Sequence, residues 1–187
     1  MTSQSAAIFH GTNCSAESFW IPWIKAKLES RGYDVWTPSL PKNEDGFAHL
    51  NQWQEVIRKE SPYQDYDLMI GHSAGVPLIF SLLSQGTLKT AHALLVAGFL
   101  NPIPEMTEDH PTHPGALDYE AIKKNGGRFT YLHSDNDPWT CDHNQGEAMR
   151  QAFGGTLVVQ TGEGHFGSEL FGQPYPTFPL LLAHCFL

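Results

Sequence analysis

The sequence LMIGHSAGVPLIFSLL, residues 68–83, joins a short apolar run to a helical pattern through five small or polar residues. Leu68 to Ile70 reads as a buried strand of a parallel sheet, and the apolar residues from Val76 to Leu83 recur at helical spacing. The residues between them, Gly71-His72-Ser73-Ala74-Gly75, match the pattern G-x-S-x-G. A preceding strand and a following helix are the context that supports this pattern as a nucleophile elbow.

The physical reason for the pattern is steric. A strand that turns sharply into a helix leaves little room for side chains beside the turn, and Gly71 and Gly75 provide that room. Ser73 is then held above the carboxyl ends of the strands, over a helix N-terminus that favours developing negative charge. We therefore expect Ser73 to be a nucleophile. The alternative is a chance glycine-rich turn, which the strand and helix on either side disfavour.

Outward from this stretch, apolar runs alternate with helical patterns along the whole chain. Such alternation predicts βαβ crossovers and a mainly parallel sheet. We expect an α/β fold with about six strands and helices on both faces, a three-layer sandwich forming one domain over residues 1–187. Residues 98–115 are expected to be a loop at the edge of the site. The expected strands lie near residues 6–9, 33–37, 68–70, 93–97, 128–132 and 156–159, and the helices near 20–28, 47–60, 76–83, 118–124, 145–153 and 178–185.

Composition excludes several classes of protein. Of 187 residues, 41% are hydrophobic and 17% charged, which is typical of a folded domain and not of a disordered chain. The formal charge of −9 disfavours nucleic acid and anionic membrane surfaces as partners. The three cysteines form no CxxC pair, so neither a disulfide scaffold nor a zinc site is indicated. No basic and apolar leader is visible, so we expect a cytoplasmic protein without a signal peptide or a membrane span.

A serine nucleophile needs a base, and the base needs an orienting acid. In serine hydrolases built on a parallel sheet, the chain order is Ser, then Asp or Glu, then His. Asp135 and Asp137 follow the fifth predicted strand. His165 lies in the loop Gly162-Glu163-Gly164-His165-Phe166, which follows the sixth predicted strand. All these loops leave the carboxyl edge of the sheet, where ligands bind. We predict a triad of Ser73, Asp137 and His165, and Asp135 is the alternative acid.

Further site residues follow from the same edge of the sheet. Two backbone amides should hold the oxyanion, that of Ala74 and one from the loop after the first strand, where we favour Thr12 over Asn13. Phe99, Trp139 and Phe166 are predicted to bind substrate, because each lies in a loop at this edge. No metal and no cofactor are expected.

With these residues in place, the chain resembles the small α/β-hydrolases typified by retinoblastoma-binding protein nine and its bacterial and fungal relatives. The resemblance covers nearly the whole chain, and its pieces are specific only as an ordered set. It implies a minimal α/β-hydrolase fold without a large cap, and a Ser-Asp-His hydrolase of esters or related acyl substrates. The residues that carry it are His10-Gly11, Phe19-Trp20, Trp23, Pro38 to Pro41, Trp53, Gly71 to Gly75, Gly98-Phe99, Ser134 to Pro138 and Gly164-His165-Phe166.

The chain departs from these relatives in two places. Trp139-Thr140-Cys141 follows the predicted acid, where relatives often show Val-Pro or Leu-Pro. The Leu-x-Cys-x-Glu box for retinoblastoma binding is absent, so that partnership is not carried over.

Three functions remain open from the sequence. The first is a serine hydrolase of carboxylic esters, with thioesters and small amides as further substrates, acting on a small-molecule acyl substrate. The second is a catalytically silent binding protein on a hydrolase fold, which would have no reason to keep all three triad residues. The third is an aminopeptidase-like amidase, for which Glu163 or Glu169 would anchor a free amine. A chain without an inserted cap further predicts an open, shallow site and modest-sized substrates.

Overall fold

The computed structural model describes residues 4–104, 106–107 and 109–187. The six strands of its sheet are all parallel, in the order β2-β1-β3-β4-β5-β6. The elements along the chain are β1 (Gln4–Phe9), α1 (Ile21–Glu29), β2 (Tyr33–Trp36), α2 (Leu50–Glu60), β3 (Asp65–His72), α3 (Gly75–Ser84), β4 (Lys89–Val96), α4 (Tyr119–Gly126), β5 (Arg128–Ser134), α5 (His143–Phe153), β6 (Thr156–Gln160) and α6 (Pro179–His184). The predicted α/β class and the predicted strand number are confirmed.

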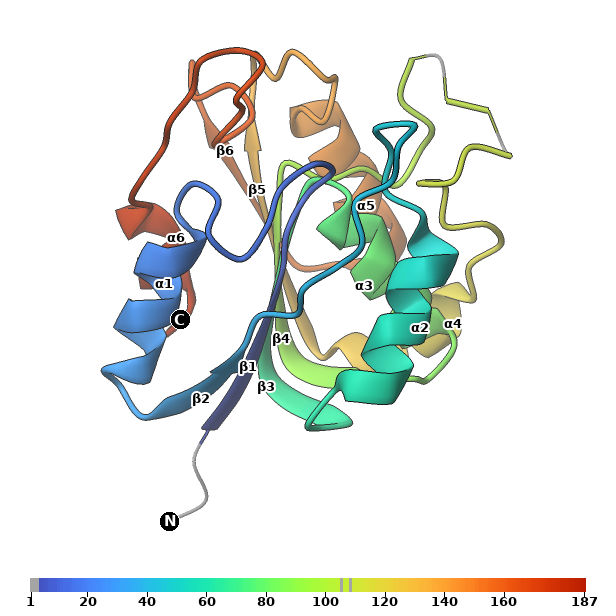
Figure 1. Cartoon of the computed structure of the whole chain (residues 1–187), viewed down its shortest axis with the longest axis vertical. Coiled ribbons are helices and arrows are strands. Elements are labelled where there is room, and N and C mark those ends of the chain that lie inside the picture. Colours follow the sequence, from blue (N-terminus) through green and yellow to red (C-terminus); the bar gives the residue numbers. More distant parts are fainter. Residues whose placement is uncertain (1–3, 105, 108) are drawn as a thin grey trace.

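Helices cover both faces of the sheet, as Figure 1 shows, with α1 and α6 on one side and α2, α3, α4 and α5 on the other. The pleat of the strands explains the two layers, because successive side chains point to opposite faces. In β1, Ala6 and Ile8 pack in the cluster with α1 and α6. Their neighbours Ala7 and Phe9 pack in the cluster with the four other helices. Both faces of this central strand are therefore buried.

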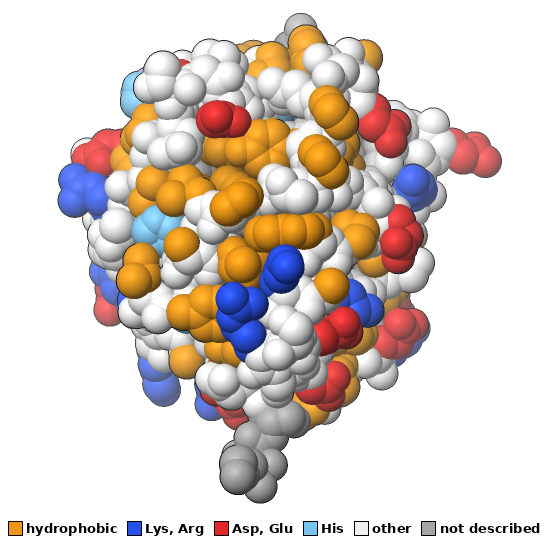
Figure 2. All heavy atoms as spheres, turned by 90° about the vertical axis from the view of Figure 1, so that its left-hand side faces the viewer, with side chains coloured by type: hydrophobic (Ala, Val, Ile, Leu, Met, Phe, Trp, Pro, Cys, Tyr) orange, Lys and Arg blue, Asp and Glu red, His pale blue; other side chains and the backbone are white. Residues whose placement is uncertain are grey.

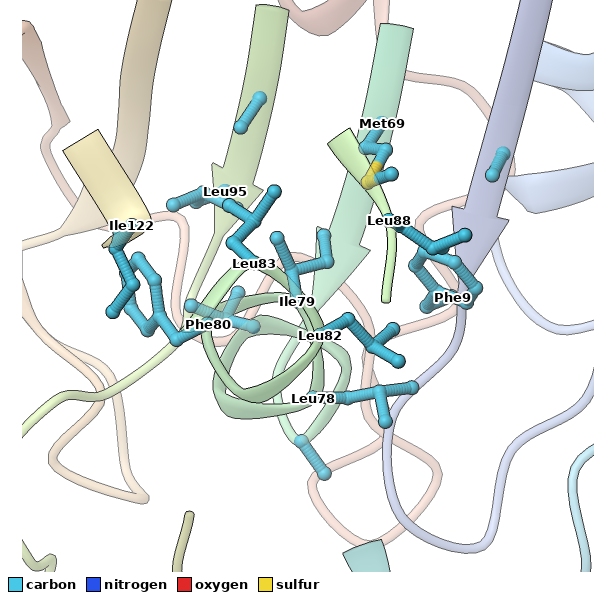
Figure 3. Packing of buried hydrophobic residues seen from close by; sticks show 14 of the residues in the cluster. Phe9, Met69, Leu78, Ile79, Phe80, Leu82, Leu83, Leu88, Leu95 and Ile122 are labelled. Carbon is cyan, nitrogen blue, oxygen red and sulfur yellow. The ribbon is translucent and has the colours of Figure 1, made fainter. Parts of the chain in front are cut away.

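The layer around α3 forms the larger part of the core. Every residue of α3 from Gly75 to Leu83 is buried, because the helix is covered by the sheet and by its neighbouring helices. Figure 3 shows Ile79 and Leu83 directed at the strands, with Met69 and Leu95 facing them from β3 and β4, and Phe80 directed at Ile122 of α4. This burial fixes the helix whose N-terminus carries Ser73.

The opposite face is covered more thinly, by α1 and α6. Figure 2 shows this side of the molecule, where hydrophobic side chains gather in the middle of the surface. Basic side chains shield part of it: the Lys27 ammonium lies 5.8 Å from the Trp23 ring centre, and the Arg31 guanidinium 5.0 Å from that of Phe186. No helix in the described residues has the length and apolar character that crossing a bilayer requires.

Two boundaries differ from the sequence-based predictions for physical reasons. The first halves of β3 and β4 alternate between exposed and buried residues, so apolar runs detected only the second half of each strand. The second helix begins at Leu50 and not at Phe47, because the Phe47 amide donates to the Asp45 side chain in a turn. Phe47 instead projects from this loop and packs edge-on against His110, with ring centres 4.6 Å apart.

Candidate active site

The turn between β3 and α3 holds Ser73 in a strained backbone conformation. Its φ of 53° lies in the left-handed region, which a non-glycine residue adopts only when the surroundings impose it. The Ser73 amide donates to the carbonyl of Val96 at the end of β4 (3.0 Å). A Cβ on Gly75 would collide with the carbonyl oxygen of Phe9, so only glycine lets the helix start this close to β1. The neighbouring strands therefore impose the turn that the sequence pattern predicts.

The loop after β1 packs directly against this turn. A Cβ on Gly11 would lie 2.9 Å from the Ser73 Cβ and 3.4 Å from its Oγ, so the loop approaches the serine closely. Thr12 follows Gly11 and lines the same cavity as Ser73. In the described part of the chain, the backbone amides of Thr12 and Ala74 donate no hydrogen bond to a protein acceptor. Both amides remain available to an oxyanion.

His165 and Asp137 meet across two loops. The distance between His165 Nδ1 and Asp137 Oδ2 is 2.7 Å, and the carboxylate is fully buried. The other carboxylate oxygen, Oδ1, accepts from the Trp139 amide at 2.8 Å. The contact with Asp137 orients the imidazole ring through Nδ1, so Nε2 is the ring nitrogen on the other side. His165 lines the cavity together with Ser73.

Asp135, the alternative acid, has a different set of contacts. Its Oδ1 accepts from the amide of Gly162 at 2.8 Å. Asn136 Oδ1 accepts from the amide of Gly164 (2.8 Å), and Ser134 Oγ accepts from that of Glu163 (3.0 Å). Three successive side chains at the C-terminal end of β5 thus hold three successive amides of the loop after β6. These bonds set the position of His165, and the structure brings Asp137 and not Asp135 to its ring.

His72, which precedes the serine, makes a contact that the sequence did not reveal. Its Nε2 lies 2.9 Å from the backbone carbonyl oxygen of His165, so that nitrogen carries a hydrogen and donates it. Burial and the nearby His165 lower the pKa of His72 to about 3, which keeps the ring neutral. Its other nitrogen, Nδ1, is buried without a partner among the described residues. His72 therefore ties the serine turn to the loop that carries the predicted base.

The cavity above Ser73 has a volume of about 770 Å³ and is walled largely by apolar side chains. Phe99 and Trp139 lie in this wall, as predicted for substrate-binding residues. Phe166 does not: it is fully buried and stacks on Phe178, with ring centres 5.0 Å apart. The sequence analysis did not find several other apolar lining residues, namely Phe19, Phe47, Ile103, Met106 and Leu170.

Two cysteines also line the cavity, Cys14 and Cys141. Burial, followed by the charge of Glu169, raises the pKa of the Cys14 thiol to about 11. Burial likewise raises the pKa of Cys141 well above the usual range. Both remain protonated thiols near neutral pH, and a thiol is a much weaker nucleophile than a thiolate. Neither competes with Ser73.

Loops from the upper ends of the strands in Figure 1 form this site. Solved structures share the fold of this chain at low sequence identity. The ydeN gene product of B. subtilis matches 98% of this chain and 99% of its own, with a TM-score of 0.79 and 19% identity. Est1E from Butyrivibrio proteoclasticus matches 98% and 86%, with a TM-score of 0.65 and 14% identity.

A third similar structure is the Paleococcus ferrophilus monoacylglycerol lipase, with a TM-score of 0.68 and 11% identity over 97% of this chain and 92% of the lipase. No curated protein sequence matches the chain significantly. The model of the family described as "Serine hydrolase" matches residues 6–183, nearly the whole chain. The chain belongs to this serine hydrolase family.

Proposed function

We propose that this serine hydrolase cleaves carboxylic esters through a triad of Ser73, Asp137 and His165. The observation that carries the proposal is the 2.7 Å contact between His165 Nδ1 and the buried Asp137 carboxylate, at the wall of the cavity that Ser73 also lines. Asp137 would hold the imidazole in the tautomer that leaves Nε2 free to accept a proton. The monoacylglycerol lipase among the similar folds, whose name denotes an ester hydrolase, is consistent with this activity.

In the proposed reaction, His165 Nε2 takes the Ser73 hydroxyl proton while Oγ attacks the acyl carbon. The amides of Thr12 and Ala74 would donate to the oxyanion, and the helix α3 N-terminus adds favourable potential there. The alcohol leaves with the proton from His165, which gives an acyl-serine. Water then attacks the acyl-serine as His165 removes its proton, and the carboxylic acid departs as Ser73 regains a proton. Thioesters and small amides would follow the same route.

The amidase alternative has one observation in its favour, because Glu169 lines the cavity. Glu163 does not line it and instead interacts with Tyr175. An amine anchor, if present, would therefore be Glu169. Glu169→Gln should reduce turnover of an aminoacyl amide far more than turnover of p-nitrophenyl butyrate. Equal effects on both substrates would remove the amidase reading.

The test of the proposed function is covalent labelling with a fluorophosphonate, read by intact mass. The wild-type protein should gain one adduct and hydrolyse p-nitrophenyl butyrate, and Ser73→Ala should do neither. Cys14→Ser is the matched control, since it alters another side chain that lines the same cavity and should still be labelled. A folded wild-type protein that gains no adduct would refute the proposal and favour the binding-protein alternative.

A further inference from the structure

The apolar wall of the cavity continues out onto the protein surface. Leu170 lines the cavity and yet is 74% exposed, and Trp139 also lines it and is 39% exposed. Phe171, 48% exposed, packs against Trp139 with ring centres 5.3 Å apart. These three residues, which we call the apolar ledge, form one surface at the mouth. Large exposed apolar side chains of this kind mark a binding surface when they lie together.

The charges around the cavity oppose an anionic ligand. Among the residues that the structure describes, no lysine or arginine lines it, and Glu169 lies next to Leu170 in the wall. Lys42 acts on Cys14, but the charge of Glu169 raises the pKa of that thiol more than Lys42 lowers it. His110 also lines the cavity, and burial lowers its pKa, which disfavours the charged form of its ring. A substrate carboxylate or phosphate would lose water here without gaining a cation.

The size of the cavity adds a third constraint. A volume of about 770 Å³ lies within the range of sites that enclose a whole drug-sized ligand. An acetyl or butyryl group would leave most of the apolar wall in contact with water. A longer chain would cover Phe99, Ile103 and Met106 and reach the ledge at the mouth. Burying these surfaces together is the larger gain in free energy.

From these observations we infer that the site takes uncharged esters with a long apolar acyl chain, of six carbons or more, whose far end lies on the apolar ledge. The inference rests on the proposed esterase function and defines its substrate class. It replaces the expectation of small substrates that the absence of a cap suggested. The ledge and the cavity wall act as the specificity-determining surface, and Glu169 excludes anions.

The experiment compares p-nitrophenyl acetate, butyrate, hexanoate, octanoate and decanoate below their aggregation concentrations. Each buried methylene can raise kcat/KM by up to about fourfold. We expect a rise of at least about tenfold from acetate to hexanoate, and a further rise to decanoate. The kcat/KM for p-nitrophenyl hexanoate should be at least about tenfold higher than that for the p-nitrophenyl monoester of adipic acid. The adipate monoester has a similar length but carries a terminal carboxylate.

Leu170→Ser tests the ledge directly, and Leu187→Ser is its matched control. Leu187 is equally exposed, at 73%, but is not among the cavity-lining residues. Leu170→Ser should lower the ratio of decanoate to butyrate kcat/KM by about fivefold, and Leu187→Ser should leave it unchanged. Both substitutions replace an exposed leucine by serine and so change polarity and side-chain volume by the same amount. A difference in their effect on the kcat/KM ratio therefore depends on the position of the residue.

The outcomes separate the two proposals. If Ser73 is labelled and acetate is cleaved as fast as decanoate, the esterase function stands and the substrate class is refuted. Equal rates for hexanoate and the adipate monoester, or equal effects of Leu170→Ser and Leu187→Ser, would refute it as well. If neither labelling nor turnover of any ester is found, the esterase function fails and the inference falls with it.

Discussion

Replacing Gly11 by alanine should impair the proposed nucleophile, Ser73, although it replaces no residue of the proposed triad. The added Cβ would lie 2.9 Å from the Ser73 Cβ, whereas carbon atoms in contact prefer about 3.5–4.0 Å. The two segments must therefore separate by about 0.6–1.1 Å. Neither can yield freely: the Ser73 amide is bonded to Val96, and the Gly11 carbonyl oxygen accepts from the amide of Cys14 (3.3 Å).

The magnitude follows from this displacement. A misplacement of about 1 Å at a reacting group can cost about 10²-fold in rate, which corresponds to about 2.7 kcal/mol in the activation free energy. The same movement would shift the Thr12 amide, the proposed second donor to the oxyanion. We expect kcat/KM for p-nitrophenyl butyrate and the rate of fluorophosphonate labelling to fall together by about 10²-fold. Overpacking should also lower the free energy of unfolding by about 1–3 kcal/mol.

Gly146→Ala is the control for this loss of stability. Its Cβ would lie 2.5 Å from Leu157 Cδ1 and 2.6 Å from His133 Cδ2, so it is also overpacked, but between α5 and the sheet. It should lower the free energy of unfolding and leave turnover per folded molecule unchanged. The reasoning would be refuted if Gly11→Ala kept wild-type kcat/KM and labelling rate. A similar rate loss in Gly146→Ala would show that general destabilisation, and not the position of Ser73, governs the effect.

Three further predictions follow from the site. Asp137→Asn should reduce kcat by about 10³–10⁴-fold in steady-state assays. Asp135→Asn should reduce kcat by less than tenfold, because its amide oxygen can still accept the hydrogen bond from the loop. Equal losses in the two variants would contradict the choice of Asp137 as the acid. His72→Leu, which removes the donor to the carbonyl of His165, should lower kcat by about 10–10²-fold with little change in KM, and His72→Gln should restore much of it. Burial lowers the pKa of His72 to about 3 and that of His133 to about 4, so both stay neutral in the fold while the unfolded chain binds protons below about pH 6.5. The free energy of unfolding should therefore be highest above pH 6.5 and fall towards pH 4, by at most ~1.4 kcal/mol per pH unit for each histidine. Urea midpoints that do not change between pH 7 and pH 5 would contradict this prediction.

The fold was predictable from the sequence because its signals are local. A buried parallel strand is apolar on both faces, and an amphipathic helix repeats every 3.6 residues, so short windows suffice to find them. The strand starts were less accurate, since Asp65–Tyr66–Asp67 and Lys89–Thr90–Ala91 alternate and lack a continuous apolar run. At these ends the strands lie at the rim of the sheet, where one face meets water.

Ser73 could be predicted as a nucleophile from its own neighbours, because the sharp turn requires the glycines that lie two residues before and two residues after it. The order of residues along the chain limited the candidates for the base and the acid, but it left two possible acids. Asp135 and Asp137 are two residues apart in the same loop, and their sequence context is nearly the same. The choice depends on which side chain faces a loop about 28 residues further along, and only the bonds from Ser134, Asp135 and Asn136 to that loop decide it.

Sequence alone determined the order of the elements, the parallel sheet and the position of the strained serine turn, since each depends on sterics and periodicity within a few residues. Tertiary structure decided which residues meet. It buried Phe166 in the core, brought the carbonyl of His165 to His72 across 93 residues, and placed Leu170 in the cavity wall with Trp139, against which Phe171 packs. These outcomes depend on the directions in which separate loops leave the sheet, and such directions are set by packing between segments that are distant in the sequence.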